Sequence, residues 1–296
     1  MYYPIYILSL LPFRILYILS DIGYLLMYYI VRYRRRIVRN NLSSSFPEKG
    51  EDEIKDIERK FYHWFCDYFL ETIKLLSISD TELRRRLKIV GAEQLEERFK
   101  AGQDCAGLLG HYCNWEWLSC IGIAFPEGRK IGLVYKPLRS KGFDNLFRRI
   151  RSSQPSSLVV PKNDILRELV KLRRDGVRSL FGYIADQGPR YANTHLWLPF
   201  LNHDTGVFTG SERIMRKMNN AIYYVEMSRP QRGYYTATFH LITHEPNSLP
   251  ENELTRRFFA LLEKTIRRQP EYYLWTHEEF NRLYRTENGK IIPINS

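Results

Sequence analysis

The sequence has few cysteines, and their spacing excludes two kinds of protein. The four cysteines among 296 residues are Cys66, Cys105, Cys113 and Cys120, and no pair has the C-x-x-C spacing of a zinc ribbon or a redox motif. The chain is long enough to bury a core of its own, so it is not a small disulfide scaffold. We expect reduced thiols, as in proteins of reducing compartments.

The chain also lacks low-complexity segments, internal repeats and any linker long enough to separate two domains. Hydrophobic residues make up 44% and charged residues 26% of the chain, which is a globular composition. Acidic residues are outnumbered by basic ones, 33 against 45, and the net charge is +12. This surplus favours anionic partners such as phospholipid headgroups, phosphorylated lipids, nucleic acid or an acidic protein.

One long hydrophobic run lies near the N-terminus, from Ile5 to Val31. It is long enough to cross a bilayer, which needs about 20 apolar residues. The chain does not start with the basic residues of a secretory signal peptide, so we expect the run to stay attached. Arg14 and Asp21 share one helical face and are costly at the bilayer centre. A helix lying in one leaflet therefore competes with a spanning helix, and a core helix of a soluble domain is the third alternative.

A basic cluster follows the hydrophobic run, namely Arg32, Arg34, Arg35, Arg36 and Arg39. By the positive-inside bias, this cluster predicts that everything downstream lies on the cytoplasmic side of a membrane. The same arginines can hold anionic headgroups. We expect residues 1–39 to be a hydrophobic membrane anchor with a basic flank, and residues 40–296 to form one globular domain.

The remainder of the chain alternates between helical and strand patterns. Residues 40–53 read as a loop, and residues 54–77 as an amphipathic helix. Residues 221–228 and 234–243 read as a hairpin, with a final helix over 252–268. Between them the expected strands are 106–109, 131–135, 158–160 and 177–185, and the expected helices are 115–124, 142–151 and 164–175. This order predicts an α/β fold with a mostly parallel central sheet flanked by helices.

A polar segment follows the apolar run that ends at Leu109. Gly110 allows a sharp turn there, and ligands of α/β proteins bind at the carboxyl ends of strands. Asn114 is a plausible helix cap, which would put Glu116 in the first helical turn, within reach of His111. A carboxylate on one imidazole nitrogen fixes the tautomer and supports the positive charge while the other nitrogen takes a proton. His111 and Glu116 are therefore candidates for a general-base dyad.

Other chemistries stay open on the residues alone. Cys113 is a rival nucleophile, although nothing around it makes a known cysteine-enzyme signature. A metal enzyme could use His240 with His244, or His195 with His203, yet none of them stands in an H-E-x-x-H pattern. A nucleic-acid binder would suit the charge, but the basic residues are spread over several helices and no recognition motif is present.

Several blocks of the sequence resemble one family. Gly-His-Tyr-Cys-Asn-Trp-Glu-Trp, which contains His111 and Glu116, is similar to the H-x4-D/E block of glycerolipid acyltransferases. It is closer to that of the late acyltransferases of lipid A biosynthesis, the lauroyl and myristoyl transferases. The other matching blocks, in the order expected for that family, are Tyr33 to Arg36, Asn41-Leu42, Ser45 to Pro47, Tyr135 to Leu138, Arg149 to Ser152, Ala185 to Gln187 and Leu274 to His277.

The resemblance implies a fold like that of the glycerolipid acyltransferases and an enzyme of the bacterial inner membrane, with residues 40–296 as a catalytic domain on the cytoplasmic side. Such an enzyme moves a fatty acyl chain from acyl carrier protein or acyl-CoA to a lipid hydroxyl, here most closely one of a lipid A precursor. The chemistry requires no cofactor and no metal, and no nucleic acid takes part. Two departures loosen the choice of acceptor: Lys136 replaces the more usual Arg, and Glu278 and Glu279 follow the Trp-Thr-His block. Another membrane lipid, such as a lysophospholipid or an aminolipid, is the alternative acceptor, and a non-catalytic lipid-binding scaffold is the alternative function.

The resemblance also implies roles for individual residues. His111 is the expected general base and Glu116 its orienting acid. Arg149 and Asp186 match further polar positions of the family's site, where Arg149 could neutralise a phosphate of the acceptor or of the phosphopantetheine arm. We group Arg151, the neighbour of Arg149, and Asn114 with them as candidate substrate-binding residues.

Overall fold

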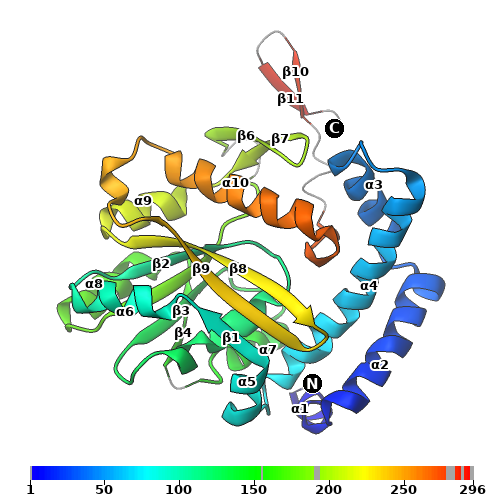
Figure 1. The fold of residues 1–296 in the computed structure, drawn as a ribbon, viewed down its shortest axis with the longest axis horizontal. Helices are drawn as coiled ribbons and strands as arrows, with labels where there is room; N and C mark the ends of the chain where they lie inside the picture. The colour runs from blue at the N-terminus through cyan, green and yellow to red at the C-terminus, as the bar shows by residue number, and fades with distance from the viewer. Residues whose placement is uncertain (1, 155, 190–193, 278–283, 288–289, 294–296) are drawn as a thin grey trace.

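A seven-stranded sheet forms the centre of the molecule (Figure 1). The computed structural model describes residues 2–154, 156–189, 194–277, 284–287 and 290–293. The strands of the sheet are β1 (Leu87–Val90), β2 (Cys105–Leu109), β3 (Lys130–Tyr135), β4 (Ser157–Pro161), β5 (Ser179–Ile184), β8 (Ala221–Gln231) and β9 (Tyr234–Thr243). Their order across the sheet is β1-β9-β8-β2-β5-β3-β4. Two small antiparallel pairs lie outside it, β6 (Leu196–Phe200) with β7 (His203–Val207) and β10 (Tyr284–Glu287) with β11 (Lys290–Pro293).

The sheet is mostly parallel, which confirms the predicted α/β fold. Strands β8, β2, β5, β3 and β4 pair in parallel, whereas β9 returns antiparallel to β8 as the predicted hairpin. Strand β1 adds to the far side of β9. Every residue of β2 is buried, as expected for a central parallel strand with both faces covered. The sheet therefore places β2 and β5 side by side at its centre, although β3 and β4 separate them in the sequence.

Helices flank the sheet. They are α3 (Arg35–Ser45), α4 (Glu51–Lys74), α5 (Asp80–Arg86), α6 (Ala92–Lys100), α7 (Lys141–Arg151), α8 (Ile165–Arg174), α9 (Gly210–Lys217) and α10 (Glu253–Arg268), with 3-10 helices η2 (Trp115–Ala124), η4 (Pro246–Ser248) and η5 (Pro270–Tyr272). The prediction of a loop over 40–53 is wrong at both ends, because α3 runs to Ser45 and α4 begins at Glu51. Burial of Val38 and Leu42 on one face of α3 stabilises helix in a serine-rich segment that reads locally as a loop.

The N-terminal hydrophobic run is divided into three helical pieces. They are α1 (Tyr2–Leu10), α2 (Phe13–Leu25) and the π-helix η1 (Leu26–Val31). Pro12 lies between α1 and α2, where its ring and its missing N–H prevent a continuous helix. The stretch Phe13–Val31 is long and apolar enough to cross a membrane by length and composition. Figure 1 shows α2 lying along α4 at one edge of the molecule, and the two helices are in contact.

Ser20 and Asp21 of α2 face the protein, whereas Arg14 is exposed. Ser20 Oγ donates a 2.6 Å hydrogen bond to Asp67 of α4, and Asp21 accepts a 2.6 Å hydrogen bond from Arg232 at the tip of the β8–β9 hairpin. The opposite side exposes large apolar side chains, namely Ile15, Ile18, Leu19, Ile22 and Leu25, continued in η1 by Leu26, Tyr29, Ile30 and Val31. Asp21, which was expected to be a difficulty for a membrane helix, is thus paired within the protein.

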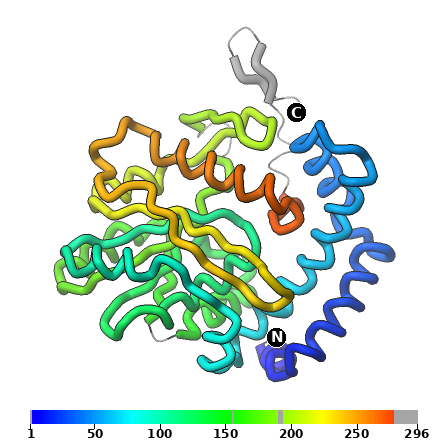
Figure 2. Tube along the Cα trace, viewed as in Figure 1, coloured from blue at the N-terminus to red at the C-terminus, as the bar shows by residue number. Residues whose placement is uncertain are grey.

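Three arginines of the basic cluster that follows the hydrophobic run, Arg34, Arg35 and Arg39, make contacts within the protein. Arg35 and Arg39 both bind Glu58, whose side chain is fully buried in α4. Arg34 donates a 2.9 Å hydrogen bond to the carbonyl of Thr276, where the chain returns to the side of α3 (Figure 2). These contacts give the arginines a structural role that the positive-inside pattern does not reveal.

Candidate active site

Loops that leave two neighbouring strands bring His111 and Asp186 together. Leu109 at the end of β2 pairs with Ile184 at the end of β5, so both loops start from the same edge of the sheet. His111 Nδ1 lies 2.7 Å from Asp186 Oδ1, and the backbone N–H of His111 donates to Asp186 Oδ2, also at 2.7 Å. This is the carboxyl edge of a parallel sheet, the expected location of a site in an α/β protein.

The Asp186 carboxylate is buried yet held ionised. Burial acts to raise its pKa, but the charge of His111 and the two hydrogen bonds from His111 outweigh burial and keep the pKa of Asp186 below its usual value. An ionised carboxylate on Nδ1 holds the proton there and leaves Nε2 of His111 as the nitrogen that accepts a proton. The His111 side chain keeps 16% of its surface exposed, so a substrate can reach it.

Glu116 has a different partner from the one expected. Its two carboxylate oxygens accept hydrogen bonds of 2.7 and 2.6 Å from Arg151 Nε and Nη2. The sequence predicted a hydrogen bond between Glu116 and one imidazole nitrogen of His111, and this is corrected: the carboxylate at His111 Nδ1 is that of Asp186. The local reason is the backbone turn at Cys113, which has a φ of 54° in the left-handed region. After this turn Trp115 packs edge-on against the His111 ring, with ring centroids 5.2 Å apart.

The structure also separates the two candidate arginines of α7. Arg151 reaches Glu116, whereas Arg149 is exposed and stacks over the ring of Tyr2 in α1, 4.3 Å from the ring centroid. Residues two apart on a helix face different directions, so only one of the two can point toward η2. The structure thus brings Arg151 to Glu116 and leaves Arg149, the first choice from the sequence, on the outside.

Asn114 is buried at the N-terminal end of η2, but its side chain makes no capping hydrogen bond. Its Nδ2 instead donates 2.9 Å to Glu71 of α4, which corrects the expected helix cap. Glu71 also accepts hydrogen bonds from Tyr17 of α2 and from Tyr235 of β9. Burial raises the pKa of Glu71, whereas Arg229 and the hydrogen bonds from Tyr235 and Asn114 act to lower it. Sequence reasoning missed Glu71 because it is one acid inside a long amphipathic helix.

A second histidine lies beside His111. The ring centroids of His277 and His111 are 5.3 Å apart, with the ring planes tilted by 41°. Gln187 also approaches, with its Nε2 3.5 Å from His111 Nε2. His277 closes the Trp-Thr-His block that contributed to the resemblance, but the sequence assigned it no role. Glu278 and Glu279, the acidic departure from the family pattern, lie outside the described residues.

The rival chemistries gain no geometric support among the described residues. Burial raises the pKa of the Cys113 thiol to about 12, so a thiolate is disfavoured there. The group of possible metal ligands found in the described part of the chain is Asp21, His63 and Asp67. None of the histidines of the pairs considered above belongs to it. Arg232 already donates 2.6 Å hydrogen bonds to both of these aspartates. The guanidinium supplies the positive charge that a cation would bring.

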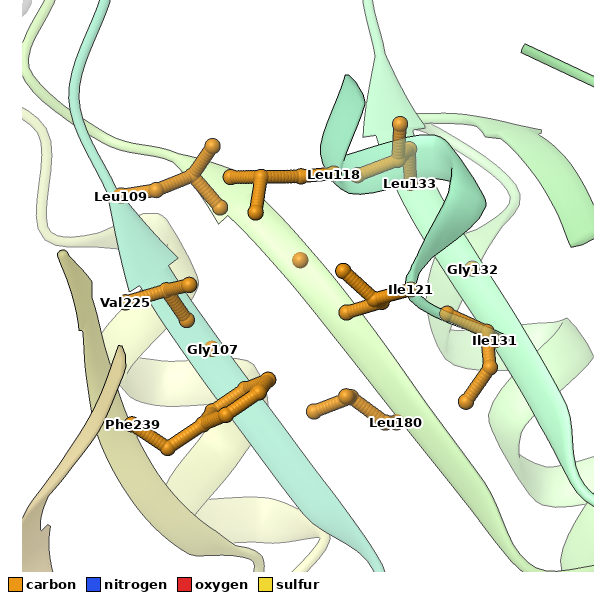
Figure 3. A pocket seen from close by; sticks show the side chains of 11 residues that line it. Gly107, Leu109, Leu118, Ile121, Ile131, Gly132, Leu133, Leu180, Val225 and Phe239 are labelled. Atoms are coloured by element: carbon orange, nitrogen blue, oxygen red, sulfur yellow. The ribbon is translucent and has the colours of Figure 1, made fainter. Parts of the chain in front are cut away.

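An apolar cavity lies between the sheet and η2 (Figure 3). Gly107 of β2 and Gly182 of β5 are paired in register and leave the space, and Leu118 and Ile121 of η2 cover it. A Cβ atom on Gly107 would come within 2.8 Å of Val225. The cavity has room for roughly one water molecule, so it holds no fatty acyl chain in this conformation.

Comparison with known proteins agrees with the resemblance. The sequence model of the bacterial lipid A biosynthesis acyltransferases matches residues 3–282. A lipid A biosynthesis acyltransferase of Haemophilus influenzae is 26% identical over 276 residues, which cover 91% of this chain and 85% of that protein. In Escherichia coli, a lipid A biosynthesis lauroyltransferase is 25% identical and a palmitoleoyltransferase 22% identical, each covering 91% of this chain and 86% of its own length.

Proposed function

This chain belongs to the bacterial lipid A biosynthesis acyltransferases, and from that premise we propose that it adds a fatty acyl chain to a hydroxyl of a lipid A precursor. It is an acyltransferase. We further propose that the acyl donor is a thioester of acyl carrier protein or CoA, and that His111 is the general base. The acceptor class rests on the relatives, which act in lipid A biosynthesis.

The observation that carries the proposed mechanism is the bond of His111 Nδ1 to the buried Asp186. In the proposed reaction, Nε2 of His111 takes the proton of the acceptor hydroxyl, and the hydroxyl oxygen attacks the thioester carbonyl carbon. Asp186 stabilises the imidazolium that forms. When the tetrahedral intermediate collapses, the C–S bond breaks and the thiolate leaves with the proton from His111. Asp186 thus takes the orienting role that the sequence gave to Glu116.

Glu116 and Arg151 serve a second purpose in this proposal. Their two parallel hydrogen bonds hold the Arg151 guanidinium of α7 against the start of η2, directly after the loop that carries His111. Because Nε and Nη2 of Arg151 are already bound to Glu116, Arg151 acts in this proposal as a positioning residue that fixes the start of η2. Arg149, exposed on α7, is suited to the approach of an anionic partner rather than to the chemical step.

We further propose that the N-terminal helices bind the membrane in the plane of one leaflet. The apolar side chains of α2 and η1 face outward, whereas Ser20 and Asp21 hold α2 against α4 and the β8–β9 hairpin. A helix that keeps these contacts cannot cross the bilayer without taking part of the domain with it. In-plane binding leaves the domain in water beside the lipid surface, and we place that surface on the cytoplasmic side of the inner membrane.

The experiment that tests the proposed function is mass spectrometry of total lipids from cells lacking this gene. The cells are complemented with wild type, with His111→Ala, or with the matched control His240→Ala, which replaces a half-exposed histidine on β9. We expect one lipid to lose a single acyl unit, and wild type and His240→Ala to restore it. Recovery by His111→Ala would instead support a non-catalytic lipid-binding scaffold. An altered phospholipid or aminolipid would identify a different acceptor.

A further inference from the structure

The backbone around His277 is held against the His111 loop by contacts from several elements. The N–H of Leu274 donates 3.1 Å to the carbonyl of His111, and the N–H of Cys113 donates 2.7 Å to the carbonyl of Tyr272. An isolated antiparallel bridge between Tyr112 and Tyr273 joins the same two segments. The two histidines therefore lie on adjacent, mutually hydrogen-bonded stretches of chain, and their separation is fixed by backbone geometry.

Helix α3 fixes the same segment from its other side. Asn41, whose side chain is buried, donates through Nδ2 to the carbonyls of Trp275 and His277, at 2.8 and 2.9 Å. Arg34 donates 2.9 Å to the carbonyl of Thr276 between them. Consecutive carbonyls are thus bound by side chains from a distant part of the sequence. This is the support expected where a side chain must be placed precisely enough to act on a substrate.

The His277 imidazole is neutral at physiological pH. Burial and the neighbouring charge of His111 lower its pKa to about 4, and Arg34 acts in the same direction, whereas Asp186 acts to raise it. A neutral imidazole is a poor proton acceptor at this pKa but retains one N–H donor. His111 differs in being bonded directly to an ionised carboxylate. The two rings are therefore suited to different tasks.

We infer that His277 is a second catalytic imidazole, whose N–H donates a hydrogen bond to the thioester carbonyl oxygen as that oxygen becomes an oxyanion. This inference rests on the proposed function. A hydroxyl held at Nε2 of His111 attacks a carbonyl that must lie beside the His111 ring, and the His277 ring centre is 5.3 Å from that ring. As the new C–O bond forms, the carbonyl π electrons move to oxygen, where the donor stabilises them. When the C–S bond breaks, those electrons re-form the carbonyl.

The test compares acyl transfer by the purified full-length chain and its variants His277→Ala, His277→Gln, His277→Leu and His240→Ala, with an acyl-carrier-protein thioester and a lipid A precursor in detergent. We expect His277→Ala to lower kcat by about 10²- to 10³-fold, the range for loss of one oxyanion donor, with little change in KM. His277→Gln, which keeps an N–H donor, should recover a measurable part of kcat. The control His240→Ala should match wild type.

The pH profile separates this role from the alternatives. Because His111 remains the base, the acid limb of the kcat/KM profile of His277→Ala should keep its midpoint while its height falls. If that limb were lost, His277 would be the base. If kcat of His277→Ala were within about threefold of wild type, His277 would not be an oxyanion donor. Either result overturns the inference. If His277→Ala does not fold, the comparison of His277→Gln with a folded His277→Leu decides. The inference requires the Gln variant to be the more active, and equal or lower activity of the Gln variant overturns it. An inactive wild type would instead refute the proposed function.

Discussion

Arg151 donates two parallel hydrogen bonds to the carboxylate of Glu116, and this pair joins α7 to the first turn of η2, directly after the His111 loop. The Glu116 side chain is only 2% exposed, so its charge is compensated by the guanidinium rather than by water. Glu116, which follows His111 by five residues, is therefore bound to Arg151, while the carboxylate at His111 itself comes from Asp186 in the loop after β5.

Removing one partner of this pair is expected to destabilise the fold. Glu116→Ala leaves the Arg151 guanidinium without its counter-charge in a largely buried position, which costs about 3–5 kcal/mol in comparable cases. The free energy of unfolding, measured by urea denaturation, should fall by that amount. The control Arg149→Ala removes an exposed arginine of the same helix and should stay within about 0.5 kcal/mol of wild type. Equal effects of the two variants would contradict the buried pairing.

Asp186→Asn is expected to lower kcat by about 10²- to 10⁴-fold, the usual contribution of general acid–base catalysis. The amide cannot support the imidazolium charge of His111 and favours the wrong tautomer. The measurement is initial-rate acyl transfer at saturating donor and acceptor, with Asp204→Asn as the control because Asp204 is exposed on β7. If Glu116→Gln abolished activity while Asp186→Asn retained it, the orienting role would return to Glu116.

Membrane binding should depend on the outward face of α2. We expect Ile18→Asp combined with Ile22→Asp to weaken binding to vesicles of phosphatidylethanolamine and phosphatidylglycerol at least about 100-fold, since each buried isoleucine contributes about 1.5–3 kcal/mol. Both side chains are at least half exposed in the protein, so folding should be preserved. Val170→Asp, at an exposed apolar position on α8, is the control and should bind like wild type. Unchanged binding of the double variant in flotation assays would refute this surface.

The neutral His277 predicts a pH dependence of stability. Its pKa is about 4 in the folded protein and about 6.5 when unfolded, so between these values the unfolded chain binds the extra proton. Stability from this group is therefore complete above about pH 6.5 and is lost as the pH falls toward 4, by about 3 kcal/mol at most. The difference in unfolding free energy between wild type and His277→Gln, followed from pH 7 to pH 4, should show this slope. A pH-independent difference would mean that His277 is protonated alike in both states.

Much of the fold could be predicted because its signals are local. The apolar runs that become β2, β3, β4 and β5, and the turn of the β8–β9 hairpin, lie within a few residues of where they were expected. Helix α3 was missed because Ser43 and Ser44 favour a loop locally, and burial of the opposite helical face overrides that preference. The N-terminal run was correctly identified as apolar. Its division at Pro12 follows from the proline itself, whereas its docking on α4 and the hairpin depends on the contacts of Ser20 and Asp21 with Asp67 and Arg232.

For the site, the sequence by itself determined that a turn at Gly110 follows a buried strand and presents His111 at its end. It also determined the family, because the motif blocks are patterns along the chain. Only the tertiary structure decided the partners, since hydrogen bonds act over a few ångströms and take no account of sequence distance. The order of the strands places β5 beside β2, so Asp186 lies within hydrogen-bond distance of His111. The left-handed turn at Cys113 directs Glu116 away from His111, and the face of α7 on which Arg151 lies brings its guanidinium to Glu116.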